Sequence, residues 1–148
     1  MPDESSLCMG SLVAQAREHR DFLRAVHTCR KDLYGPGPDL EAAVGLYRSE
    51  WLSKLSSAPD LLPPLEVAWV FHLHRLNPNV YQADCMRAFG HIVQTPRPFA
   101  FQSSEDAETE AEAVQEALCM PSVAVGFDLI ECARRQSQFL WQVRWWEY

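Results

Sequence analysis

The stretch that most constrains the fold lies near the middle of the chain, between a pair of prolines and an Asn-Pro pair. Residues 65–73 are almost wholly apolar, Pro63 and Pro64 precede them, and Asn77-Pro78 follows them. Proline is tolerated in the first turn of a helix, and a residue before proline is pushed out of the helical region. The spacing therefore predicts a helix between these breaks. Because this helix is apolar on nearly every side, we expect the other helices to surround it.

Five further helices are expected around the central one. Apolar residues recur every three or four positions over residues 7–31, 39–55, 79–93 and 122–143, which is the period of an amphipathic helix. Either Ser122 or Asp128 starts the last of them. A fifth segment, residues 105–118, carries acidic side chains in its first turn, where they complement the helix dipole.

The arrangement of these segments predicts the fold class. Loops are expected at residues 34–38, 56–62 and 95–104, and residues 1–8 are expected to fray. At 148 residues the chain has the usual size of one domain. The sequence thus predicts an all-α protein, a compact single-domain bundle of about six helices over residues 1–148.

Charge and cysteine content exclude several classes of protein. The net charge is −7 with a pI near 5.1, whereas nucleic-acid binding draws on clustered basic residues, so no nucleic acid partner is expected. Five cysteines without a C-x-x-C pair indicate neither a disulfide framework nor a zinc knuckle. No apolar run approaches the ~20 residues of a membrane span, and the acidic N-terminus does not resemble a targeting segment. These features favour an acidic, cytoplasmic protein with no membrane span.

Side chains that can carry chemistry gather on the two helices that flank the Asn-Pro turn. These helices must pack antiparallel, because the turn between them is short. The group consists of Trp69, His72, His74, Arg75, Tyr81, Asp84, Cys85 and His91. Such a group permits three functional interpretations: a metal site, a cysteine nucleophile paired with a histidine, and a small-ligand pocket.

The metal and catalytic interpretations share their histidines. A transition metal such as zinc would take its ligands from His72, His74, Cys85 and His91. A catalytic site would use His72, His74, Asp84 and Cys85 as acid, base and nucleophile. Residues two apart on an ideal helix are separated by about 200°, so His72 and His74 cannot both face one metal from regular geometry. We expect one ring to point inward and the other elsewhere.

The third interpretation is a ligand pocket, and a structural explanation competes with all three. The pocket would be lined by Trp69, His72, His74, Arg75 and Tyr81. A histidine on an apolar helix more often bonds a carbonyl or carboxylate, and Asp84 is a ready partner. Cys85 then acts as a small buried group, and Arg75 pairs with Asp84.

Aromatic residues crowd the last ten positions of the chain. Exposed aromatic side chains at this density lower solubility, so they either return onto the bundle or bury against another chain. Trp and Tyr are also enriched at the centres of protein interfaces. The expected interface residues are Trp141, Trp145, Trp146 and Tyr148.

The central hairpin resembles the signature of a known family. Residues 69–85 read Trp-x-x-His-x-His-Arg-Leu-Asn-Pro-x-x-Tyr-x-x-Asp-Cys, and Phe89-Gly90 follows. This pattern is similar to that of the glycine-rich domain-containing protein-like family, and Arg135-Gln136-Ser137-x-Phe139 resembles the family's last helix. The resemblance covers about residues 12–143 and implies a helical domain of unknown function. The chain lacks the beta-rich and glycine-rich regions that follow this domain in plant members.

These observations lead to two hypotheses from different classes. The first is a non-catalytic helical interaction module that binds protein, either a partner protein or further copies of itself. The alternative is a metal- or small-ligand-binding enzyme that uses His72, His74, Asp84, Cys85 and His91.

Overall fold

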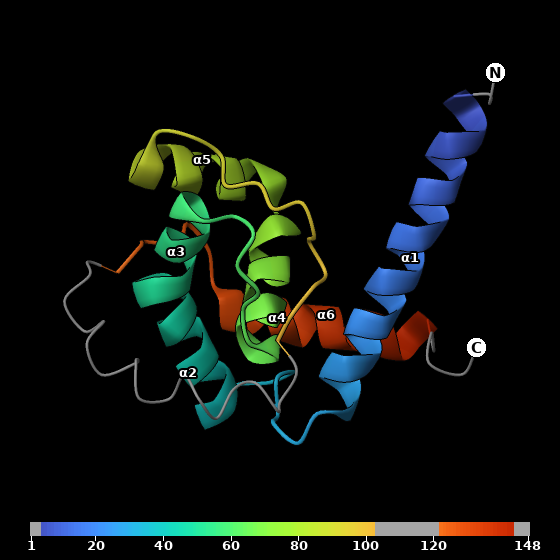
Figure 1. Ribbon diagram of the computed structural model, residues 1–148. Coiled ribbons are helices and arrows are strands. Elements are labelled where there is room, and N and C mark those ends of the chain that lie inside the picture. The colour runs from blue at the N-terminus through green and yellow to red at the C-terminus, as the bar shows by residue number, and fades with distance from the viewer. Residues whose placement is uncertain (1–3, 103–121, 144–148) are drawn as a thin grey trace.

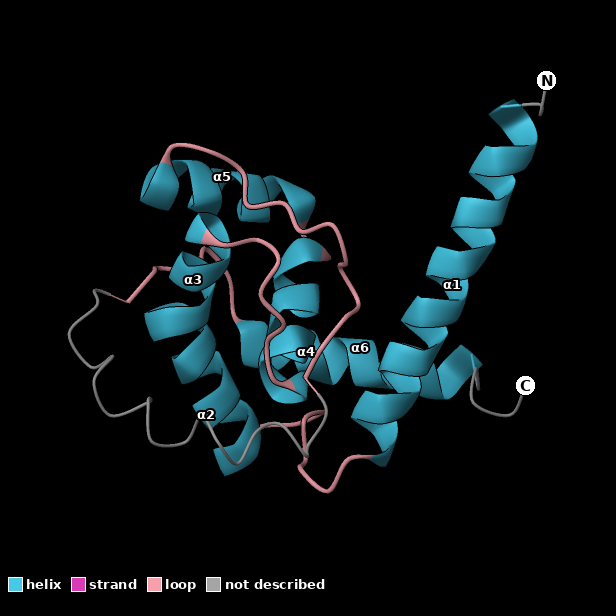
Figure 2. Ribbon diagram, viewed as in Figure 1, coloured by secondary structure: helices cyan, strands magenta, loops and turns pink. Residues whose placement is uncertain are grey.

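The computed structural model describes residues 4–102 and 122–143 (Figures 1 and 2). Within these two ranges the chain is helical and has no strand, and an isolated bridge joins Pro64 to Gln102. The helices are α1 (Glu4–Thr28), α2 (Pro38–Leu46), the π-helical segment η1 (Tyr47–Trp51), α3 (Leu52–Ser57), α4 (Leu65–Arg75), α5 (Pro78–Phe89) and α6 (Leu129–Val143). The predicted all-α fold is confirmed. None of the described helices is both long and apolar enough to cross a membrane.

The described ranges contain five continuous helices where about six were expected. The segments α2, η1 and α3 follow one another without a break, so they form one helix with a π-helical turn in its middle. In that turn the N–H of Leu52 bonds the carbonyl of Tyr47, five residues back. The helix expected over residues 105–118 lies outside the described residues.

Helix α4 occupies the centre of the molecule, as the prolines and the apolar run predict. Val67, Trp69, Val70 and Leu73 are completely buried. In Figure 1, α4 lies between α2 and α3 on one side and the lower half of α1 on the other, with α5 above it and α6 behind it. The two histidines of this helix, His72 and His74, are therefore placed in the core.

Two helix boundaries are set by local signals. Helix α5 ends at Phe89, four residues before the expected end, because Gly90 adopts a left-handed conformation with φ 75° and caps the helix. The last helix begins at Leu129, and Asp128 Oδ1 accepts hydrogen bonds from the N–H groups of Ile130 and Glu131 at 3.0 and 3.1 Å. Asp128, not Ser122, therefore starts it.

Helix α1 packs on the body with only its C-terminal half. Phe22, Leu23 and Val26 are buried there. The N-terminal half projects away from the other helices (Figures 1 and 2), and every residue from position 11 to 18 is exposed.

Candidate functional site

His74 and Asp84 form a buried pair across the Asn-Pro turn. Antiparallel packing of α4 on α5 places His74 Nε2 2.9 Å from Asp84 Oδ2, and both residues are almost fully inaccessible. On its other side, His74 Nδ1 lies 2.7 Å from the hydroxyl of Tyr47, which η1 contributes. A neutral imidazole satisfies both contacts when Nε2–H donates to the carboxylate and the Tyr47 hydroxyl donates to Nδ1.

Asp84 receives two more donors. The N–H of Gly126 donates to Oδ2 at 2.9 Å, and Arg87 pairs closely with Oδ1. Arg87 also donates to the carbonyl of Ala124 at 3.1 Å. The predicted pairing of Arg75 with Asp84 is therefore wrong, because Arg87, one turn further along α5, takes that position.

The surroundings fix the charge states in this network. Burial alone would raise the pKa of Asp84, but hydrogen bonds from Gly126, His74 and Arg87 outweigh it and hold that pKa below its usual value. Burial lowers the pKa of His74, although the Asp84 carboxylate opposes this. Burial also raises the pKa of Tyr47 well above 10. An ionised Asp84 beside a neutral histidine and a neutral tyrosine holds three helices and the loop at 123–126 together.

His72 lies on another side of α4, among aromatic rings. Its ring stacks on Trp69 at a centroid distance of 5.8 Å and lies 5.2 Å from the ring of His19 on α1. The Nε2 atom of His72 is buried and has no hydrogen-bond partner among the described residues. Burial, with the nearby His19 and Arg75, lowers the pKa of His72 to about 3. The two histidines thus lie in separate environments, because residues two apart on a helix point about 200° away from each other.

The remaining candidate metal ligands do not converge. Cys85 is completely buried in the core. His91 is exposed beyond α5, with Nε2 3.2 Å from Ser56 Oγ and Nδ1 3.2 Å from the carbonyl of Phe89. Across residues 4–102 and 122–143, no three His, Cys, Asp or Glu side chains lie close enough together to hold a metal.

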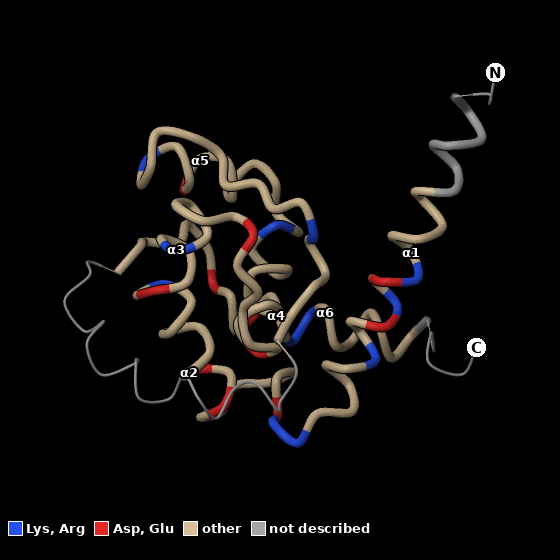
Figure 3. The backbone as a smooth tube through the Cα atoms, in the orientation of Figure 1, with Lys and Arg blue, Asp and Glu red and all other residues tan. Residues whose placement is uncertain are grey.

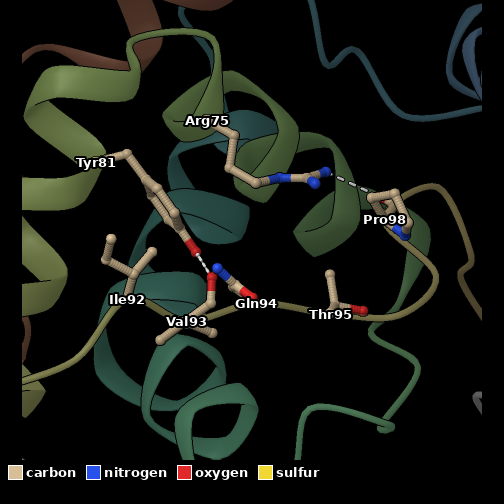
Figure 4. Close-up of a pocket in the computed structure, with 7 residues that line it drawn as sticks. All are labelled: Arg75, Tyr81, Ile92, Val93, Gln94, Thr95 and Pro98. Atoms are coloured by element: carbon tan, nitrogen blue, oxygen red, sulfur yellow. Dashed lines mark hydrogen bonds between the residues drawn. The ribbon is translucent and has the colours of Figure 1, made fainter.

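Two of the five predicted ligand-binding residues line a surface pocket. Trp69 is fully buried and donates from Nε1 to the carbonyl of Leu33 at 2.9 Å, so it stabilises the core. Arg75 and Tyr81, in contrast, line a pocket of 340 Å³ with the segment 92–95 and Pro98 (Figure 4). The Tyr81 hydroxyl donates to the carbonyl of Val93 at 2.5 Å.

The predicted aromatic interface is described only in part. Trp141 on α6 is 58% exposed, and its ring meets that of His27 edge-on at a centroid distance of 6.0 Å. Phe139 is also exposed. The predicted residues Trp145, Trp146 and Tyr148 lie outside the described residues.

Two curated plant proteins match nearly the whole chain. Glycine-rich domain-containing protein 2 of Arabidopsis thaliana is 30% identical over 159 residues, which cover 89% of this chain and 20% of that protein. Glycine-rich domain-containing protein 1 of the same plant is 30% identical over 161 residues, with coverage of 89% and 19%. The chain belongs to the glycine-rich domain-containing protein-like family. It spans about a fifth of the length of these relatives. No family model and no solved structure matches the chain.

Several residues of the buried network around His74 and Asp84 could not be predicted from the sequence. In the sequence, Tyr47 belongs to the apolar stripe of its helix, and nothing indicates a polar contact. Arg87 reads as a surface residue of α5, and Gly126 falls in a loop without a motif. The one signal for Arg87 is its spacing of three residues from Asp84, which permits an ion pair on a helix.

Proposed function

We propose that this chain is a non-catalytic helical module that binds a partner protein through α1. The observation that carries the proposal is an apolar stripe on α1 that continues beyond the body of the molecule. The stripe consists of Leu12, Ala16, His19, Leu23 and Val26, at alternating spacings of four and three residues. Leu23 and Val26 are buried against the body, whereas Leu12 is 55% exposed.

The exposed part of the stripe supports a binding role on energetic grounds. Most helical stability in proteins comes from packing of an apolar face, and a short helix alone is marginal in water. No described residue covers Leu12 or Ala16. A helix packed along this part of the stripe would bury both side chains and extend the interface that α4 forms with the lower half of α1.

Charges beside the stripe favour an acidic amphipathic helix of another protein as the occupant. Arg17, Arg20 and Arg24 are exposed and share one face of α1. Figure 3 shows acidic positions between the basic ones along this helix, and Arg20 pairs with Asp21 at 3.1 Å, which leaves Arg17 and Arg24 for a partner. An amphipathic helix with acidic flanks would complement both features. A second copy of this chain fits less well, because each copy carries a net charge of −7.

The buried polar network supports a non-catalytic role. His74, Asp84 and Tyr47 use one another and neighbouring groups as partners, and all three are inaccessible. A catalytic acid or base must come within hydrogen-bond reach of a substrate. These side chains therefore serve the fold that presents α1.

Site-specific photo-crosslinking in cells tests the proposal. A photoreactive residue at position 12 is expected to give a discrete adduct with another protein, and the same residue at position 14, on the opposite side of α1, is not. The captured protein is then purified. Leu12→Glu is expected to weaken its binding at least tenfold, and the matched control Ala14→Glu to leave it unchanged. Equal adducts from both positions, or an adduct of two copies of this chain, would contradict the proposal.

A further inference from the structure

The guanidinium of Arg75 is a half-buried cation with no carboxylate partner among the described residues. Its Nη2 donates to the carbonyl of Pro98 at 2.8 Å, and its Cζ lies 4.4 Å from the centre of the Phe71 ring. Its Nε is buried without a hydrogen-bond partner. Arg87, in contrast, pairs with Asp84, and Arg134 pairs with Glu131. Because removing a cation from water is costly without a counter-charge, an anion bound beside Arg75 would offset part of that cost.

The pocket beside Arg75 has the chemistry of a small-molecule site. Its volume of 340 Å³ lies near the lower end of the range for such sites, roughly 300–1,000 Å³. None of its lining residues is acidic, and Arg75 is the charged one among them. Ile92 and Pro98 give apolar surface, and Gln94 and Thr95 give polar groups. Figure 4 shows Arg75 and Tyr81 reaching from the helices toward the segment that carries these residues.

The polar groups of this segment can act as donors to a ligand. The Thr95 hydroxyl accepts the N–H of Arg97 at 3.3 Å, which leaves its own proton for another acceptor. Gln94 is exposed, so its side-chain amide is accessible to a ligand. The Tyr81 hydroxyl already donates to Val93, so Tyr81 presents its ring and not a free donor.

We propose that this pocket binds a small organic carboxylate, with its acid group on Arg75 and its apolar part against Ile92 and Pro98. A guanidinium presents parallel N–H groups that match the two oxygens of a carboxylate. Inorganic phosphate would satisfy the charge but would leave the apolar wall without a contact. The site is independent of the stripe on α1, so it is a second binding function of the same chain.

Titration followed by nuclear magnetic resonance tests this site in the whole chain. The probes are 3-methylbutanoate and its neutral analogue 3-methylbutanamide, which share the same apolar part. The carboxylate is expected to shift the backbone amides of Gln94 and Thr95 in a saturable way, with a Kd of about 1 mM for so small a ligand. The amide is expected to bind at least tenfold more weakly. Equal effects of the two probes, or shifts centred elsewhere on the chain, would overturn the proposal.

Two variants and one further probe sharpen the test. Arg75→Gln is expected to weaken binding of the carboxylate at least tenfold, because a charge-assisted hydrogen bond is lost. Arg97→Gln is the matched control, since Arg97 is exposed and does not line the pocket. Equal losses in both variants would refute the assignment to Arg75. If inorganic phosphate binds more tightly than 3-methylbutanoate, the proposal that the ligand is an organic carboxylate is refuted. If Arg75→Gln fails to fold, the comparison of 3-methylbutanoate with 3-methylbutanamide on the original chain still tests the proposal.

Discussion

Replacing His72 by leucine tests whether this ring is held neutral in the core. The side chain is 6% exposed, among Trp69, Phe22 and His19, and its pKa is lowered to about 3. In the unfolded chain the same group has a pKa of 6.5. Between these two values the unfolded chain binds a proton that the folded chain does not, so stability falls as the pH decreases. The stabilising effect is fully present above pH 6.5.

The magnitude follows from the separation of the two pKa values. One pKa unit corresponds to 1.36 kcal/mol, and acidification from about pH 6.5 to about pH 4.5 crosses two units. Because the unfolded group is already half protonated at pH 6.5, His72 alone should then lower the free energy of unfolding by about 2.3 kcal/mol. Leucine at position 72 does not titrate, so this loss should disappear. At pH 7 we expect the variant to differ from the original chain by about 1 kcal/mol or less, because the buried Nε2 has no partner to lose.

Urea denaturation at both pH values measures the effect. The comparison is between the original chain, His72→Leu and a control, His91→Gln, in which an exposed histidine is removed. His19 and Arg75 stay in all three proteins, so their own contributions cancel. If His72→Leu loses as much stability on acidification as the original chain, the ring is not buried in its neutral form and the reasoning is wrong.

Three further predictions concern the core and the Asp84 network. Asp84→Asn removes the charge that three donors share and should lower the free energy of unfolding by about 2 kcal/mol in urea denaturation; an unchanged value would make the network dispensable. Gly126→Ala places a Cβ atom 2.9 Å from Val80 Cγ1 and should cost about 1–3 kcal/mol, whereas Gly45→Ala, in open space on α2, should be neutral or stabilising. Cys85 is completely buried, so a thiol reagent should react with it only after unfolding; reaction in the native protein as fast as at Cys29 would contradict this.

The central helix could be predicted because local rules decide it. The prolines before it and Asn77-Pro78 after it set its two ends. The apolar run between them requires that the helix be buried on nearly every side. The π-helical turn at Tyr47–Trp51 could not be predicted, because one extra residue in a turn leaves no mark in composition. The end of α5 was predicted too late. Val93 is buried, but it lies on the segment after Gly90.

A contact between Asp84 and one of the two histidines could be predicted, since the short turn brings the two helices together. Which histidine makes it, His74, follows only from the structure. The partners of Asp84 that lie outside the hairpin could not be predicted. Gly126 is 42 residues away in the chain, and only the tertiary arrangement brings its N–H to the carboxylate. Arg75 follows His74 by one residue and therefore points about 100° away from it, toward Pro98 and not toward Asp84.

The loop at 123–126 has a consequence for the order of folding. His74 and Asp84 are ten residues apart, whereas Val123 meets Arg48 across 75 residues through two hydrogen bonds, from Val123 N–H to the Arg48 carbonyl at 2.9 Å and from Arg48 Nε to the Val123 carbonyl at 3.0 Å. Closing the longer loop costs about 1.8 kcal/mol more in chain entropy. Gly126 can also bond Asp84 only where the hairpin already holds that carboxylate. We therefore expect the α4–α5 hairpin to form early and α6 to dock last, on a surface that the hairpin has completed.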